Sequence, residues 1–186
     1  MNVLAISGSL RAGSYNTALA RAAARLAPEG VLVELYDGLA TLPPYDQDLD
    51  EDESETPASV LDLRKRIEAA DAIFIVTPEY NGSIPGVLKN AIDWASARHR
   101  GSSLQNKTVA IAGVTTGQYG AIWAQQDLRK VLGIGGARVI AGELPVSGAV
   151  TRFDERGELA DPMVAERVRA HLGALVAEAA PIPIAA

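Results

Sequence analysis

The sequence predicts an α/β protein, a three-layer sandwich in which helices cover both faces of a five-stranded parallel sheet. Apolar runs of strand length alternate along the chain with stretches whose apolar residues recur at helical spacing, as in successive β–α units. The first, third and fourth runs are almost continuously apolar, which is typical of strands covered on both faces. The expected strands are residues 3–7, 31–36, 72–77, 108–114 and 138–144.

Each expected helix has one apolar stripe, the pattern of a helix packed against a sheet. Thr56 and Asp161 each precede a proline, which suits an N-cap followed by proline at the first helical position, and Ser83 before Pro85 suits the same role. The stripes are Leu19, Ala22, Ala23 and Leu26; Val60, Leu63 and Ile67; Val87, Leu88, Ala91, Ile92 and Ala95; Ile122, Leu128, Val131 and Leu132; and Val164, Val168, Leu172, Leu175 and Val176.

Five such units suit the flavodoxin-like strand order 2-1-3-4-5 with right-handed crossovers, although periodicity alone does not decide the order. We expect residues 1–180 to form one domain and residues 181–186, which contain two prolines, to be a loose C-terminal tail. Sheets of this type bind ligands beyond the carboxyl ends of their strands. The loops after the first, third and fourth strands are therefore where chemistry is expected.

Composition excludes several classes of function. The net charge is −6, and the acidic residues between positions 46 and 55 account for it, so nucleic acid and anionic membranes are poor partners. The chain has no cysteine and only two histidines, which argues against thiol catalysis and against a metal site. No apolar run is long enough to span a membrane, and the first residues lack the basic region of a signal peptide, so we expect a cytoplasmic protein with a small-molecule partner.

The first loop, residues 7–16, has the composition of a phosphate site. It lies between a strand and a helix N-terminus, where backbone N–H groups and the helix dipole favour an anion. Ser9, Ser14 and Asn16 can donate hydrogen bonds, and Arg11 supplies a full positive charge. The loop matches neither the dinucleotide fingerprint nor the Walker A motif. A capped turn without a ligand is the alternative, but it would not need so many donors.

The second and third loops suit a flat heterocycle. Residues 77–86 contain two prolines and two glycines, and Tyr80 and Asn81 offer an apolar face, an amide and backbone donors. Residues 115–120 add hydroxyls and glycines that can line the other side of the ring. Taken singly, the second loop is as well explained by an ordinary surface turn, and the third by a hydroxyl-rich cap. Together with the first loop they place a phosphate site and a ring platform at one sheet edge.

Two motifs resemble the NADPH-dependent FMN reductase family, to which flavodoxin-like quinone and chromate reductases belong. They are Gly8-Ser9-Leu10-Arg11-x-x-Ser14-x-Asn16 and Pro78-Glu79-Tyr80-Asn81-x-Ser83-x-Pro85-Gly86-x-Leu88-Lys89-Asn90-Ala91-Ile92-Asp93-Trp94. After Ser96 many relatives continue with Arg-Pro, whereas this chain has residues 97–100 as Ala-Arg-His-Arg. The resemblance implies non-covalent FMN, NADPH or NADH as electron donor, and a homodimer or homotetramer.

The same resemblance implies the cofactor-binding residues. Ser9, Arg11, Ser14 and Asn16 would hold the FMN phosphate, with backbone help from Tyr15 and Thr17. Pro78, Glu79, Tyr80, Asn81 and Gly82 would line the isoalloxazine, and Thr115, Thr116, Gly117 and Gly120 would complete the third loop. The implied activity is transfer of two electrons from NAD(P)H through FMN to a quinone-like or other small acceptor.

The flavin would supply the redox chemistry, so we expect no catalytic acid or base from the protein. Two alternatives stay open: an FMN electron carrier of flavodoxin type that does not react with NAD(P)H, and a flavin-free domain that uses the phosphate loop for another ligand. Among the other polar residues, His99 and His171 are interpreted as surface and structural histidines, and residues 64–66 as a solvated basic helix face. Trp94 and Trp123 are interpreted as core or interface residues.

The acidic stretch 46–55 is interpreted first as a solvated loop. It could instead border an interface or repel anionic acceptors, and the last use would favour neutral quinones over chromate.

Overall fold

The computed structural model describes residues 1–52, 54–96 and 101–180. The elements are β1 (Asn2–Ser7), α1 (Tyr15–Leu26), β2 (Leu32–Tyr36), η1 (Gly38–Thr41), α2 (Gln47–Glu51), α3 (Ala58–Ala69), β3 (Ala72–Thr77), α4 (Gly86–Ala95), β4 (Thr108–Val114), α5 (Ile122–Ile134), β5 (Arg138–Val139), β6 (Leu144–Val146), η3 (Ala149–Thr151) and α6 (Pro162–Ala179). The C-terminal tail, residues 97–100 and with them His99 lie outside the described residues.

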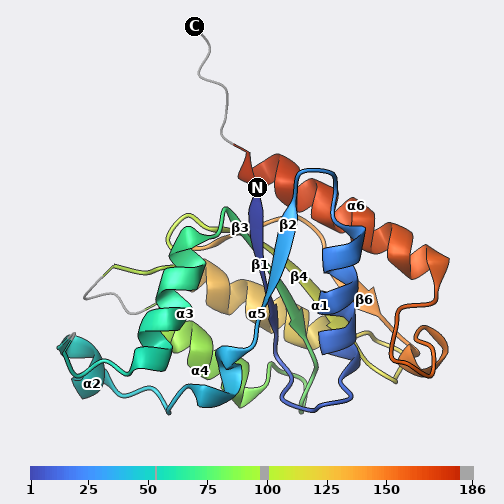
Figure 1. The fold of residues 1–186 in the computed structure, drawn as a ribbon. Coiled ribbons are helices and arrows are strands. Elements are labelled where there is room, and N and C mark those ends of the chain that lie inside the picture. The colour runs from blue at the N-terminus through green and yellow to red at the C-terminus, as the bar shows by residue number, and fades with distance from the viewer. Residues whose placement is uncertain (53, 97–100, 181–186) are drawn as a thin grey trace, which may run out of the picture.

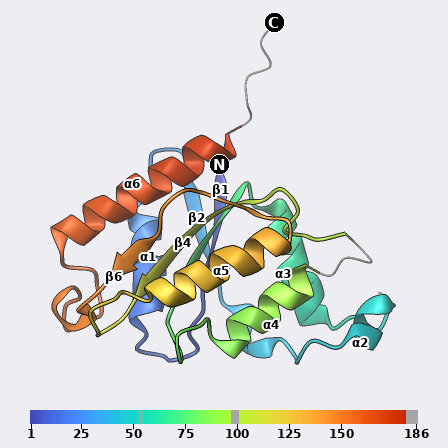
Figure 2. The same cartoon turned by 180° about the vertical axis from the view of Figure 1, so that it is seen from behind.

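The predicted three-layer sandwich is confirmed. All strand pairs are parallel and the order is β2-β1-β3-β4-β5, with β6 also paired to β4. Helices α3, α4 and α5 cover one face of the sheet, and α1 and α6 cover the other (Figures 1 and 2). Alternate residues of the central strands supply the two cores: Ile73 and Ile75 belong to the first, Phe74 and Val76 to the second. Burial on both faces explains why these strands are continuously apolar.

The prediction of one fifth strand over residues 138–144 is wrong, because the structure divides it into β5 and β6. Gly142 between them has φ +80°, a conformation that ends a strand and favours glycine. Two side chains of helix α5, Arg129 and Gln125, lie one turn apart and bind backbone groups of this segment. The Arg129 guanidinium donates to the carbonyls of Ile140 and Gly142 at 2.8 and 2.9 Å, and the Gln125 Oε1 accepts from the Leu144 N–H at 3.1 Å.

Of the three expected caps, only Asp161 is confirmed. Its carboxylate accepts from the N–H groups of Met163 and Val164 at the start of α6. Thr56 does not cap α3, since its hydroxyl donates to the carbonyls of Leu49 and Asp52 and the helix begins later, at Ala58. Ser83 donates to the carboxylate of Asp127 on α5 instead of capping α4.

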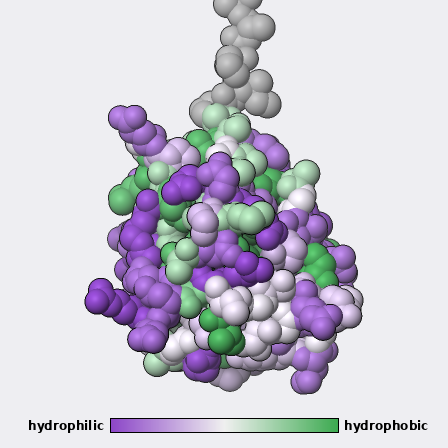
Figure 3. Space-filling model, turned by 90° about the vertical axis from the view of Figure 1, so that its right-hand side faces the viewer, coloured by the Kyte–Doolittle hydropathy of each residue, from purple (hydrophilic) through white to green (hydrophobic). Residues whose placement is uncertain are grey.

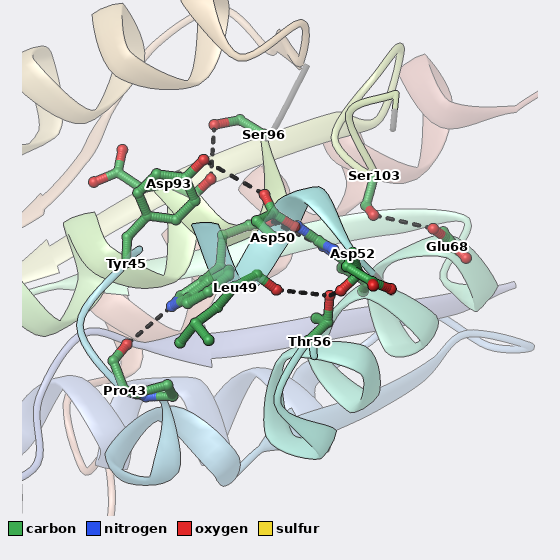
Figure 4. Close-up of polar contacts among 12 residues, drawn as sticks. Pro43, Tyr45, Leu49, Asp50, Asp52, Thr56, Glu68, Asp93, Ser96 and Ser103 are labelled. Carbon is green, nitrogen blue, oxygen red and sulfur yellow. Dashed lines mark hydrogen bonds and ion pairs between the residues drawn. The ribbon is translucent and has the colours of Figure 1, made fainter. Parts of the chain in front are cut away.

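The acidic stretch is not simply a solvated loop, and the basic face is not simply solvated. Residues 47–51 form the short helix α2, and the side chain of Asp50 is fully buried. Arg64 on α3 donates to the Asp50 carboxylate at 2.6 Å and to the Trp94 carbonyl at 3.0 and 2.8 Å. The Asp50 carboxylate also accepts from the Tyr45 hydroxyl (Figure 4). A buried ion pair thus joins α2, α3 and the C-terminal end of α4.

The segment before α2 is held against α4 by the same group of side chains. The indole of Trp94, which is fully buried as expected, donates to the Pro43 carbonyl at 2.9 Å. Asn90 also donates to that carbonyl, and its Oδ1 accepts from the Tyr45 N–H. The ring of Tyr45 packs edge-on against Trp94, with centroids 4.8 Å apart. These contacts fix α4, whose N-terminal end follows the second predicted site loop.

No helix in the described ranges is long and apolar enough to cross a bilayer.

Candidate flavin site

The three predicted loops lie at one edge of the sheet, at the lower side in Figure 1. They follow β1, β3 and β4, which are neighbours in the sheet. Loops one and two are joined directly, because the Gly8 N–H donates to the Val76 carbonyl at 2.9 Å. A Cβ on Gly8 would lie 3.0 Å from Leu88 and 3.2 Å from Pro78, so this position suits the smallest residue. The topology therefore brings the predicted phosphate site and ring platform side by side.

The first loop is built around the N-cap of α1. The Ser14 hydroxyl oxygen accepts from the N–H groups of Asn16 and Thr17 at 3.2 and 3.4 Å. The Thr17 hydroxyl lies 2.8 Å from that of Ser7, which ties the first helical turn to the end of β1. Ser9 Oγ accepts from the Arg11 N–H, which fixes the turn between strand and helix. The loop is thus ordered by its own hydroxyls before any ligand binds.

Arg11 is the cation of this loop. Its side chain is exposed, with the guanidinium 5.9 Å from the ring centroid of Tyr15, and it forms no ion pair with any described carboxylate. Its charge is therefore available to an incoming anion. A guanidinium offers paired N–H donors that match the oxygens of a phosphate.

Asn16 has a different position from the other polar residues of the loop. Its side chain is buried: its amide donates to the Val114 carbonyl at 3.0 Å, and its Oδ1 accepts from the Val114 N–H at 2.9 Å. This pair of bonds joins the start of α1 to the end of β4. The side chain is thus used to fix loop one against loop three.

The second loop is a tight turn anchored on α5. Tyr80 and Ser83 form an antiparallel bridge, and Asn81 and Gly82 between them have φ of 53° and 76°, which both residue types tolerate. Tyr80 is exposed, Asn81 and Gly82 lie at the exposed tip, and Pro78 is buried at the base of the turn. This turn presents an aromatic side chain and a glycine next to each other at the sheet edge.

Glu79 connects this turn to the third loop. Its Oε2 accepts from the backbone N–H groups of Trp123 and Ala124, each at 3.1 Å. The N-cap residue of α5, Ala121, has no side-chain acceptor of its own, so Glu79 supplies the missing cap and a favourable charge for the helix dipole. The Lys130 ammonium, together with the Ser83 hydroxyl, lowers the pKa of the nearby Asp127 carboxyl. The turn is thus held by two side-chain contacts to α5, one from Glu79 to the backbone and one from Ser83 to Asp127.

The third loop packs against the segment that follows β6. The Thr115 N–H donates to the Val146 carbonyl and the Thr115 carbonyl accepts from the Ala149 N–H, both at 3.0 Å. A Cβ on Gly120, whose φ is +58°, would lie 2.6 Å from the Val146 nitrogen, so only glycine fits there. Thr116 and Gly117 are exposed next to these anchored residues. The loop therefore approaches β6 closely while keeping its tip accessible.

Comparison with known proteins decides the family. Residues 1–151 match the family described as NADPH-dependent FMN reductase. The chain belongs to this family. This FMN reductase family member is 41% identical over 176 residues to an NAD(P)H-dependent FMN reductase of Pseudomonas aeruginosa, covering 94% of this chain and 93% of that one. It is 42% identical over 132 residues to a quinone reductase of Escherichia coli, covering 71% and 69%.

A solved structure agrees with both the family and the fold. The flavoenzyme NAD(P)H:(acceptor) oxidoreductase FerB of Paracoccus denitrificans matches with a TM-score of 0.85 and 34% identity, over 96% of each chain. The flavodoxin-like fold and the family expected from the two motifs are therefore confirmed for this FMN reductase family member.

The donor set of the three loops fits FMN. Loop one offers an unpaired guanidinium, hydroxyls and a capped helix N-terminus for a phosphate, and loops two and three offer an aromatic ring and close backbone for a flat ring system. No carboxylate of the described residues pairs with Arg11. In the described ranges no three His, Cys, Asp or Glu residues cluster in a way that would hold a metal ion.

The sequence analysis did not predict two parts of the site at this sheet edge. Tyr119 and Trp123 form an exposed aromatic pair with ring centroids 4.9 Å apart, next to the backbone that Glu79 binds. Their spacing of four residues across a helix start is a readable signal for such a pair. The segment after β6 was missed because the single fifth strand predicted from the sequence ends at residue 144, before this segment begins.

Proposed function

We propose that the protein transfers two electrons from NAD(P)H through bound FMN to a quinone-like or other small acceptor. The arrangement that supports this most directly is the unpaired guanidinium of Arg11, in the loop capped by Ser14, next to the exposed Tyr80 turn at the same sheet edge. The relatives named as FMN and quinone reductases support the enzyme over the electron carrier.

Each loop has a distinct role in this proposal. Arg11, Ser9 and Ser14, with the N–H groups of Tyr15 and Thr17, would bind the phosphate, while Asn16 holds the loop in place through its bonds to Val114. Charge-assisted hydrogen bonds from a guanidinium to phosphate are among the strongest available to a protein. Because the phosphate is tethered to the ring, fixing it also limits where the ring can lie.

The second and third loops would orient the ring and exclude water from one side of it. Pro78, Tyr80, Asn81 and Gly82 would contact the ring from loop two, and Glu79 would hold this turn against α5. Thr115, Thr116, Gly117 and Gly120 would bound the site from loop three. FMN, when bound, supplies the hydride and electron transfer itself. The protein contributes proximity by holding the donor next to the ring, and no side chain of the three loops is required as an acid or base.

An anaerobic absorbance titration tests this function. Protein loaded with FMN is titrated first with NADPH and then, in a separate sample, with NADH, and bleaching of bound flavin is followed. Prompt bleaching by either nucleotide, followed by reoxidation on adding a benzoquinone, is expected. Bound flavin that stays oxidised would favour the electron carrier, and failure to retain flavin would refute the assignment of the first loop.

The role of Arg11 has its own test. Arg11→Ala is expected to weaken FMN binding by about 1–3 kcal/mol, the usual range for loss of a hydrogen-bonded charge pair. Arg21→Ala is the control. Arg21 is also exposed, and its substitution removes the same charge from the adjacent helix α1. Calorimetric titration of both variants with FMN measures the difference. Equal affinities of the two variants would contradict a phosphate contact from Arg11.

We further propose that the protein is cytoplasmic and that it forms a homodimer or homotetramer. The family resemblance implies the assembly. Sedimentation equilibrium of the FMN-loaded protein tests the assembly.

A further inference from the structure

A separate cavity lies beside the flavin site, where β6 ends and α6 begins. It has a volume of about 140 Å³, several times the roughly 30 Å³ share of one liquid water. Figure 3 looks onto this side of the molecule, on which hydrophilic residues predominate and hydrophobic areas are small and separate. The cavity is lined by Val146, Ser147, Arg152, Met163, Val164 and Arg167.

Two guanidinium groups from different elements reach this cavity. Arg152, which follows η3, is paired with Asp161, and Arg167 comes from the second turn of α6. Both carboxylate oxygens of Asp161 are already engaged, one by Arg152 and the other by the first N–H groups of α6. The N-cap of α6 is thus a carboxylate, which disfavours an anion at this helix N-terminus, so the N-terminus is not the binding element.

Of the two arginines in the cavity, Arg152 is paired with a carboxylate and Arg167 is not, within the described residues. Within the described residues its only hydrogen bond runs from Nη2 to the Pro145 carbonyl, at 2.9 Å, and it forms no ion pair. A guanidinium has five N–H donors, so most of them face no protein acceptor. The nearby Glu166 is paired with Arg169 on the same helix. Among the residues that the structure describes, no carboxylate lines the cavity itself.

The cavity is connected to the flavin site through the chain segment that forms its floor. The carbonyl of Val146, which lines the cavity, accepts from the Thr115 N–H of loop three. One residue beyond Ser147, the Gly148 N–H donates to the Gly117 carbonyl at 3.0 Å. The segment that lines the cavity is therefore bonded directly to loop three of the proposed flavin site.

We propose that the cavity binds a phosphate group of the nicotinamide dinucleotide, with Arg167 as its main partner. This inference rests on the proposed function, because the dinucleotide is the ligand that would span both places. The planar, unpaired guanidinium and the Ser147 hydroxyl match phosphate oxygens. Met163, which is three-quarters exposed, and Val164 provide an apolar wall for the attached nucleoside.

The group bound is either the 2′-phosphate, present in NADPH alone, or the pyrophosphate, which NADPH and NADH share. The two sources are separated by measuring the binding of 2′,5′-ADP and of 5′-ADP to the FMN-loaded protein by calorimetry. The variant is Arg167→Gln, which keeps a donor for the Pro145 carbonyl. The control is Arg169→Gln, which removes the same charge from an exposed position of α6 that is not part of the cavity.

Arg167→Gln is expected to weaken the binding of 2′,5′-ADP at least tenfold, and Arg169→Gln less than twofold. Loss for 2′,5′-ADP alone assigns the 2′-phosphate. The two compounds share only the phosphate on the adenosine 5′-oxygen, so loss for both assigns the adenosine-side phosphate of the pyrophosphate. Equal affinities of the two variants for both compounds, or no binding to the unsubstituted protein, overturn the proposal. Reduction of the flavin by NADPH or by NADH in the same preparations shows separately whether the proposed function holds.

Discussion

The buried ion pair between Asp50 and Arg64 predicts a large effect of a single substitution on stability. Arg64→Met keeps the length of the side chain but removes the guanidinium from a carboxylate whose side chain is fully buried. It also removes both hydrogen bonds to the Trp94 carbonyl at the end of α4. Loss of one partner of a buried ion pair lowers the free energy of unfolding by about 3–5 kcal/mol.

That loss is a large share of the roughly 5–15 kcal/mol that stabilises a typical domain. For a chain of this length it corresponds to a fall in Tm of roughly 6–20 °C. Urea unfolding and thermal melts, both with FMN at one fixed saturating concentration, measure it.

Arg66→Met is the matched control on the same helix. Arg66 is paired with Glu34 and Asp62 at the surface, where water and salt weaken such pairs, so a much smaller shift is expected. The double variant Asp50→Leu with Arg64→Met removes both charges and is expected to recover part of the loss. A shift for Arg64→Met no larger than that of the control would refute the importance assigned to the buried pair.

Two other predictions concern the loops and pH. Gly120→Ala places a Cβ 2.6 Å from the Val146 nitrogen at a φ of +58°. It is expected to lower the free energy of unfolding by about 1–3 kcal/mol, measured by thermal melts, and to weaken FMN binding, measured by FMN titration. Burial lowers the pKa of His171, with a smaller contribution from Arg129 and Arg167, so the unfolded chain takes up the proton more readily than the folded one. Stability should therefore fall as the pH drops through about 6.5, and His171→Gln should flatten this part of the urea midpoint–pH profile; an unchanged profile would contradict it.

The main features of the fold and the place of the site follow from local sequence patterns. Alternating β–α units decide that the loops after β1, β3 and β4 meet at one edge, whatever the details of packing. The cap at Asp161 was also readable, because its acceptor and donors lie within three residues of each other.

Contacts between distant residues could not be read in this way. Asn16 looks like a loop donor, but its partner Val114 is 98 residues away. Asp50 and Arg64 each belong to a run of like charges that suggests a solvated surface, and only the packing of α2 against α3 brings them together. The division of the fifth strand was not predicted either, because the backbone between β5 and β6 is bound by Arg129 of α5, through the carbonyls of Ile140 and Gly142.

The division of the last strand also affects how the protein avoids aggregation. A long, straight outer strand offers a row of free backbone groups on which another chain can form a sheet. Here the outermost pieces beside β4 are two and three residues long. Pro145 has no N–H to donate, and side chains of α5 already bond several of the backbone groups between the two pieces. This border of the sheet is therefore a poor template for strand addition, so folded copies should not associate by adding strands to it.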